Sequence, residues 1–78
     1  MRARRLKSSL IDRVVFDDEA ETLRVSFRGS GRSYTYFGVP RAIYDALTTA
    51  RSAGRFFNEA IRGHFAVQSN RRRYPLES

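Results

Sequence analysis

Histidine, cysteine and serine are the side chains most often used in nucleophilic catalysis, and this chain offers few of them. His64 is the only histidine in the 78 residues, and there is no cysteine. A histidine-based triad, a dyad or a zinc site therefore has no obvious second member. Ser8 and Ser9 have no evident base partner, and we expect them to tether the start of a strand. The sequence predicts no catalytic residue, no enzyme activity and no cofactor.

Two short patterns match ligand sites only in part. The segment Gly29-Ser30-Gly31 lacks the third glycine of a dinucleotide loop and the lysine of a phosphate-binding loop, so it is typical of a turn between strands. Asp17, Asp18, Glu19 and Glu21 lack the spacing of a calcium loop. A weak cation site is one interpretation of this acidic group, and a solvated hairpin tip is the other. We assign no metal ligands.

Arginines on alternate strand positions form the pattern that best indicates binding. Arg13, Arg24 and Arg28 are expected to share one sheet face with Phe37, because side chains alternate along a strand. Guanidinium groups contact phosphates and a phenyl ring stacks on bases, so this face could hold a nucleic-acid strand. The alternative is the polar face that a half-exposed antiparallel sheet presents to water. The predicted nucleic-acid-binding residues are Arg13, Arg24, Arg28, Arg32, Phe37, Arg55, Arg71, Arg72 and Arg73.

The net charge of +7 is concentrated at the two ends of the chain. Glu77 is the only acid there, whereas arginines and acids nearly balance between residues 8 and 70. The basic residues at the ends are Arg2, Arg4, Arg5, Lys7, Arg71, Arg72 and Arg73. Residues 1–7 and 66–78 are predicted to be basic tails, either binding an anionic polymer or only keeping the chain soluble.

Residues 11–37 are predicted to form three strands, over residues 11–16, 23–28 and 33–37. The connections between them are too short for parallel pairing, so the strands should form an antiparallel meander. Regular alternation places Val14 and Phe16 on one face of the first strand and Ile11 on the other face. A bulge near Asp12 or Arg13 would reconcile them.

The register of the second hairpin decides where Tyr34 and Tyr36 point. A two- or four-residue loop sets Phe27 opposite Tyr34 and Val25 opposite Tyr36, with both tyrosines in the core. A three-residue loop turns the tyrosines outward and places Arg28 opposite Arg32. We prefer the even loop, because like charges directly opposite each other cost stability.

Two helices are predicted after the strands. Pro40 can begin a helix over residues 40–50, whose apolar stripe is Ile43, Ala46, Leu47 and Ala50. Ser52 can cap a second helix that ends at Gly63. The predicted fold is α+β, a three-stranded antiparallel β-meander with two C-terminal helices packed on one face.

The composition predicts one small domain. Hydrophobic residues make up 41% of the chain, which is enough for a folded core, and 78 residues leave no room for a second one. The absence of cysteine excludes disulfides. No apolar run reaches the roughly 18 residues of a membrane span, and no secretory signal is visible, so we expect a cytoplasmic chain with no membrane contact.

The motifs and their order resemble the KTSC domain, a short bacterial module named for its occurrence at the C-terminus of some lysyl-tRNA synthetases and also found alone. The resemblance covers residues 8–65. The family pattern is matched by Ser8-Ser9, Tyr34-Thr35-Tyr36, Val39-Pro40, Ser52-Ala53-Gly54, Phe56-Phe57-Asn58 and Ile61-Arg62. The chain departs from it at Phe65, where a tyrosine is common. The resemblance implies RNA binding by association with a tRNA enzyme.

Two functions are compatible with these features. The first is a non-catalytic module that binds RNA, either tRNA or single-stranded, or another nucleic acid. The second is a protein-interaction module in which Phe37, Phe57, Tyr44 and Arg55 anchor a protein partner. Phosphate contacts would make the first kind of binding strongly salt-dependent.

Overall fold

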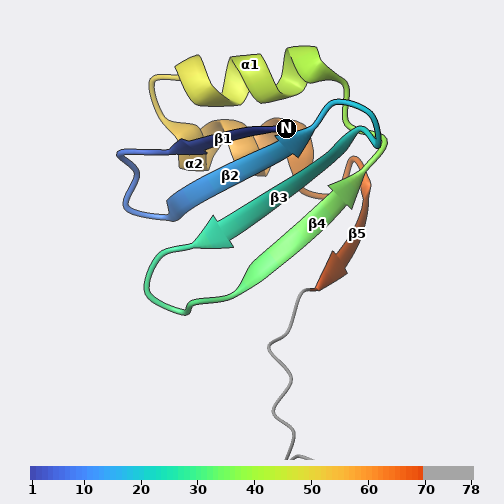
Figure 1. Ribbon diagram of the computed structural model, residues 1–78. Coiled ribbons are helices and arrows are strands. Elements are labelled where there is room, and N and C mark those ends of the chain that lie inside the picture. The colour runs from blue at the N-terminus through green and yellow to red at the C-terminus, as the bar shows by residue number, and fades with distance from the viewer. Residues whose placement is uncertain (70–78) are drawn as a thin grey trace, which may run out of the picture.

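Five antiparallel strands form one sheet, and the helices cover one of its faces (Figure 1). The computed structural model describes residues 1–69. The strands are β1 (Arg2–Arg5), β2 (Ile11–Asp17), β3 (Thr22–Phe27), β4 (Ser33–Phe37) and β5 (Ala66–Ser69), and their order in the sheet is their order in the chain. The helical segments are α1 (Arg41–Thr49), α2 (Ala53–Phe56) and η1 (Phe57–Ile61), the last a π-helix that continues α2. The α+β class and the antiparallel sheet are confirmed, whereas the prediction of three strands is wrong.

The two additional strands lie in the segments that were predicted to be tails. β1 pairs with β2, from Arg2 opposite Phe16 to Arg5 opposite Arg13. β5 pairs with β4, from Ser69 opposite Tyr34 to Ala66 opposite Phe37. Every residue of both strands is exposed, so neither contributes the buried alternating side chains that identify a strand in a sequence. Backbone hydrogen bonds to an adjacent strand that is already in the sheet are enough to hold such an edge strand in place. Residues 70–78 of the predicted C-terminal tail lie outside the described residues.

The inner strands keep the predicted facing of their side chains. A register shift between Ile11 and Arg13 is the expected bulge, and it brings Ile11, Val14 and Phe16 into the core. The loop of the second hairpin has an even number of residues, as we preferred. Tyr36 therefore faces the core and is buried, with 5% of its surface exposed.

The predicted partners in that hairpin are displaced by two residues. Tyr34 lies opposite Val25, not Phe27, and Tyr36 lies opposite Leu23, not Val25. Phe27 N–H donates to the carbonyl of Arg32 at 2.8 Å, which closes a four-residue loop over residues 28–31. Gly29 and Gly31 have φ values of 91° and 72°, a region that glycine adopts without strain.

The core lies between the helix-covered face of the sheet and the helices. The sheet contributes the buried residues of β2, β3 and β4, and the helices contribute Tyr44, Leu47, Phe57 and Ile61. The ring of Phe57 is at the centre of an aromatic group, with its centroid 5.4 Å from Phe27 and 5.6 Å from Tyr36. Phe16 stacks on Tyr44 at 5.3 Å. Aromatic contacts therefore join the two layers.

The helix ends follow the predicted signals closely. Pro40 is the residue that caps α1, and Ala50 is at its other end. The Ser52 side chain accepts a hydrogen bond from Arg55 N–H at 3.3 Å, which confirms it as the cap of the second helical segment. Gly63, with a φ of 80°, follows the end of η1. Within residues 1–69, no helix is long and apolar enough to cross a membrane.

Candidate nucleic-acid interface

The sheet face that the helices leave uncovered carries two of the predicted binding arginines, Arg13 and Arg24. We call it the open face, and the figures view the sheet from this side (Figure 1). The strand register places on it Arg5, Arg13, Val15, Arg24, Ser26, Ser33, Thr35 and Phe37. Arg5, Arg13 and Arg24 are exposed, and Phe37 keeps 40% of its surface in contact with solvent. The predicted placement of Arg13, Arg24 and Phe37 on this face is confirmed, and Arg5 is added to it. Arg28, which was predicted to share the face, lies beyond the end of β3 and is held by other contacts.

Four of these residues follow one diagonal across the strands, which we call the arginine track. Arg5 lies directly opposite Arg13 on the neighbouring strand. Arg13 lies opposite Ser26, so Arg24, two residues away, is its diagonal neighbour. Arg24 lies opposite Thr35, which makes Phe37 its diagonal neighbour in turn. Each diagonal step is about 7–8 Å between Cα atoms, close enough for long side chains to act on one bound molecule.

The guanidinium groups of the arginine track are available to an anion. Within residues 1–69, Arg13 and Arg24 form no ion pair or side-chain hydrogen bond. Arg5 is weakly paired, with Nε 3.9 Å from Asp12 Oδ1 at an exposed position. Two like charges opposite each other at Arg5 and Arg13 destabilise the sheet slightly, and a bound phosphate would relieve that repulsion.

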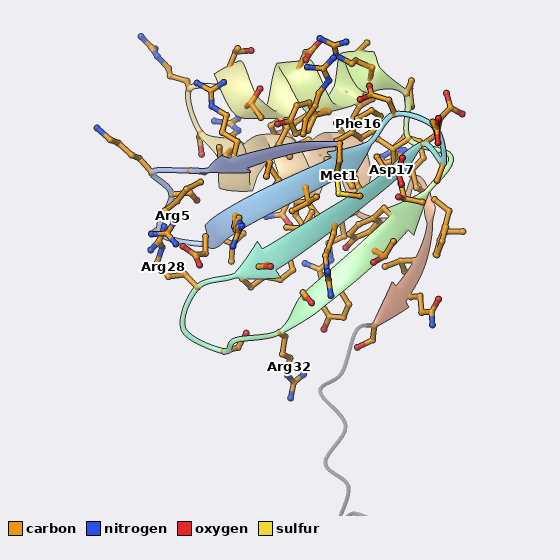
Figure 2. The ribbon with its side chains drawn as sticks, viewed as in Figure 1. Met1, Arg5, Phe16, Asp17, Arg28 and Arg32 are labelled. Atoms are coloured by element: carbon orange, nitrogen blue, oxygen red, sulfur yellow. The ribbon has the colours of Figure 1, made fainter. Side chains whose placement is uncertain are left out.

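The open face has a basic end and an acidic end. Figure 2 shows Arg5 at one end of the sheet and Asp17 at the other. Asp17 Oδ1 accepts hydrogen bonds from the backbone N–H of Glu19 at 3.0 Å and of Ala20 at 3.2 Å, so it shapes the hairpin turn. In the described part of the chain, no three His, Asp or Glu side chains are grouped to hold a metal ion. The acidic end limits how far a polyanion can extend along the face.

Arg28 is occupied by contacts within the protein. Its Nε donates to the Ser8 carbonyl at 2.8 Å, and Nη2 donates to the Leu6 carbonyl at 2.9 Å. Nη1 lies 3.4 Å from Asp12 Oδ1. The guanidinium thus fastens the segment between β1 and β2 to the end of β3, beside Arg5 in Figure 2. Ser8 Oγ helps from within that segment, because it accepts from Leu10 and Ile11 N–H at 3.1 Å each. The predicted tether at Ser8 is confirmed.

The remaining predicted residues lie away from the arginine track. Arg55 is on α2, in the other layer, where its Nε is 3.1 Å from Glu59 Oε2. Arg32 is at the end of the second hairpin and points away from the sheet (Figure 2). Arg71, Arg72 and Arg73 lie outside the described residues. The structure therefore brings Arg13, Arg24 and Phe37 together, and separates them from Arg28, Arg32 and Arg55.

Two of the proposed protein anchors are not accessible. Phe57 is 3% exposed and Tyr44 is buried against Phe16, so both are core residues. His64 is exposed in the turn after η1, as expected for a residue that follows a helix stop.

The hydroxyl of Tyr36 gives the fold a testable dependence on pH. Burial raises the pKa of Tyr36 above its usual value of 10.0, and nearby Tyr34 adds to the rise while Arg62 opposes it. In the unfolded chain the phenol ionises at the lower pH. The resulting stability is complete below about pH 10 and is lost as pH rises through the folded-state pKa. Urea unfolding from about pH 9 to about pH 11 should show a steeper loss for the parent chain than for Tyr36→Phe. Equal slopes would contradict this prediction.

Comparison with known proteins agrees with the fold and with the motifs. The model of the KTSC domain family matches residues 7–65. A protein of Tsukamurella paurometabola is 35% identical over 60 residues, covering 77% of this chain and 88% of the relative. An uncharacterised protein of Stutzerimonas stutzeri is 39% identical over 57 residues, covering 73% and 79%.

A solved structure extends this likeness to three dimensions. The crystal structure of a KTSC domain protein from Yersinia pestis superposes with a TM-score of 0.80 at 33% sequence identity, over 86% of this chain and 93% of that one. The association with lysyl-tRNA synthetases remains an implication of the resemblance. The family match, the two relatives and the shared fold all agree, and the chain belongs to the KTSC domain family.

Proposed function

We propose that this chain is a small non-catalytic module that binds RNA or another nucleic acid, in single-stranded form, on the open face. The observation that carries the proposal is the arginine track, in which exposed guanidinium groups from β1, β2 and β3 precede an exposed phenyl ring on β4. Phosphates would contact Arg5, Arg13 and Arg24, and one base would stack on Phe37.

A single strand suits this surface better than a duplex. The track is only four strands wide, and its acidic end at Asp17 would repel a second line of phosphates. Stacking on Phe37 needs an unpaired base, which a duplex does not present on its surface. Phosphate contacts carry no sequence information, so we expect little sequence preference.

Fluorescence anisotropy with labelled oligouridine, at a series of salt concentrations, tests the proposal. For single strands the logarithm of the binding constant falls with the logarithm of salt, with a slope of about −0.7 for each phosphate neutralised. The variant Arg13→Gln/Arg24→Gln should bind more weakly and have a slope smaller in magnitude by about 1.4. A folded tRNA should bind less tightly than a single strand of equal length.

The matched control removes the same charge from the opposite layer. Arg41 and Arg55 are exposed helix residues paired with Asp45 and Glu59, so Arg41→Gln/Arg55→Gln lowers the net charge equally without touching the open face. If both double variants lose affinity to the same extent, net charge and not the arginine track is responsible. No binding by the parent chain at low salt would remove the proposal.

The second candidate function is a protein-interaction module. The observation that favours it is the edge strand β5, which carries no charged residue and whose Val67 side chain is 53% exposed. Edges of this kind recognise extended peptides through main-chain hydrogen bonds.

A further inference from the structure

Tyr36 has a buried hydroxyl for which the described part of the protein provides no hydrogen-bond partner. The side chain is 5% exposed, and its ring packs edge-on against Phe57, with 5.6 Å between the ring centroids. Within residues 1–69, the hydroxyl neither donates nor accepts a hydrogen bond. A buried tyrosine hydroxyl usually has a partner, because leaving it without one costs stability. A bound molecule could supply the acceptor that the hydroxyl lacks.

Two further polar groups lie near this hydroxyl. Tyr34 is on the same side of β4, because side chains alternate along a strand. Arg62 follows η1, and its backbone N–H donates to the Phe57 carbonyl at 2.9 Å, so Arg62 lies one turn beyond the ring that contacts Tyr36. Burial is the main cause that raises the pKa of Tyr36, while Tyr34 adds to the rise and Arg62 opposes it. Both groups are therefore close enough to act electrostatically on the Tyr36 hydroxyl. We call Tyr34, Tyr36 and Arg62 the tyrosine–arginine cluster.

The donors of the tyrosine–arginine cluster are not used by the described residues. Arg62 is exposed, and in the part of the chain that the structure describes its side chain forms no ion pair or hydrogen bond. The Tyr34 ring packs against Phe27 at 5.7 Å, and across residues 1–69 its hydroxyl has no hydrogen-bond partner either. Arg62 also ends a π-helix, a rare element that is frequent at functional sites. The cluster thus presents a guanidinium fork and two hydroxyls that can all donate.

The chemistry of the tyrosine–arginine cluster matches a carboxylate. An ionised carboxylate only accepts hydrogen bonds, and its single negative charge balances that of Arg62. A phosphate monoester carries a charge of about −1.5 to −2 near neutral pH and would leave negative charge unbalanced beside the aromatic rings. Val67 lies opposite Tyr36 and faces the same side of the sheet, where its side chain is 53% exposed. It offers an apolar contact to the rest of such a ligand.

We propose that Tyr34, Tyr36 and Arg62 bind a carboxylate that carries a short branched apolar group, and that this group packs on Val67. A free carboxylic acid and the C-terminal residue of a peptide present the same chemistry, so either is a possible source. The site is on the helix side of the sheet, and the open face is on the other side. The proposal therefore goes beyond nucleic-acid binding and does not depend on it.

An NMR titration of the full chain with 3-methylbutanoate at neutral pH tests the proposal. We expect a Kd of about 1 mM, which is ordinary for so small a ligand, with shifts in the Arg62 Nε–H and Val67 methyl signals. The neutral amide 3-methylbutanamide has nearly the same shape and should bind about tenfold more weakly or worse, because it lacks the charge. N-Acetylvaline mimics a peptide C-terminus. Tighter binding than 3-methylbutanoate would identify a peptide as the source, and weaker binding would identify a free acid.

Two pairs of substitutions provide the matched comparisons in the protein. Arg62→Gln should weaken the binding of 3-methylbutanoate about tenfold, whereas Arg51→Gln removes the same charge at an exposed position after α1 and should leave it unchanged. Tyr36→Phe removes only the hydroxyl and should weaken binding about fivefold. Tyr44→Phe removes the same atom from a buried tyrosine that stacks on Phe16, and it should have no effect. Because the Tyr36 hydroxyl has no partner within residues 1–69, Tyr36→Phe should stay folded at neutral pH.

Three outcomes would overturn the proposal. They are equal affinity for the acid and its amide, unaltered affinity after Arg62→Gln, and effects of Tyr36→Phe and Tyr44→Phe that do not differ. The variant Arg13→Gln/Arg24→Gln should bind 3-methylbutanoate as the parent chain does, because its substitutions lie on the open face. Its behaviour with oligouridine and with 3-methylbutanoate distinguishes a failure of the nucleic-acid proposal from a failure of this one.

Discussion

Phe57→Ala is expected to destabilise the fold by about 4 kcal/mol, the cost typical of removing a buried phenyl ring. Phe57 is 3% exposed, and its ring contacts both Phe27 and Tyr36 across the two layers. A chain of this size has a free energy of unfolding of roughly 4–12 kcal/mol, so the variant should be largely unfolded or close to it at room temperature. Circular dichroism during urea denaturation measures the effect.

The control for Phe57 is the phenylalanine on the open face. Phe37→Ala removes the same atoms from a position with 40% exposure and should cost about 1 kcal/mol or less. Phe57→Leu should recover much of the loss, because leucine fills part of the cavity. If the two alanine variants were equally stable, Phe57 would not be central to the core.

Arg28→Gln is expected to lower the free energy of unfolding by about 2 kcal/mol. The substitution removes the donors to the Leu6 and Ser8 carbonyls and the partner of Asp12. A charged hydrogen bond contributes about 1.5–3 kcal/mol when buried, and the partial exposure of Arg28 reduces this. Arg28→Lys should recover little, because an ammonium group cannot reproduce the planar fork. Urea denaturation gives the stability, and amide exchange at Leu6 reports the local loosening.

Arg32→Gln supplies the comparison for Arg28. Arg28 is the first residue of the hairpin loop and Arg32 follows its last residue, and both carry the same charge, but within residues 1–69 the Arg32 side chain has no hydrogen-bond or ion-pair partner. We expect a change within about 0.5 kcal/mol. A similar loss from both substitutions would indicate that charge, and not the contacts of Arg28, stabilises this end of the sheet.

The inner part of the fold could be predicted because its side chains alternate between core and solvent. Simple alternation puts Ile11 on the opposite face from Val14 and Phe16, and this mismatch located the bulge. Repulsion between two arginines argued against an odd-numbered hairpin loop and favoured the even one, which buries Tyr36. The exact partners in the second hairpin could not be predicted, because Arg28 leaves the ladder and its N–H donates to the Leu10 carbonyl at 2.9 Å. That contact depends on a segment distant in sequence.

The edge strands and part of the candidate site were not readable from the sequence. Arg5 belongs to a run of arginines with no apolar alternation, and only its pairing opposite Arg13 places it on the open face. Arg28 has the same strand parity as Arg24, yet within residues 1–69 Arg28 is held by backbone carbonyls and the Arg24 side chain forms no hydrogen bond or ion pair. The sequence alone does not separate an arginine with a structural role from one that is available for binding, whereas the tertiary contacts do.

Among residues 1–69, the buried core residues all lie between Leu6 and Ile61, so neither β1 nor β5 contributes to the core. We therefore expect each of these strands to detach while the interior stays packed, at a free energy well below that of global unfolding. Nearly the same stretch, residues 7–65, is the part that the family model matches. We therefore expect that the two edge strands can change in sequence, and acquire new binding specificities, with little effect on the stability of the fold.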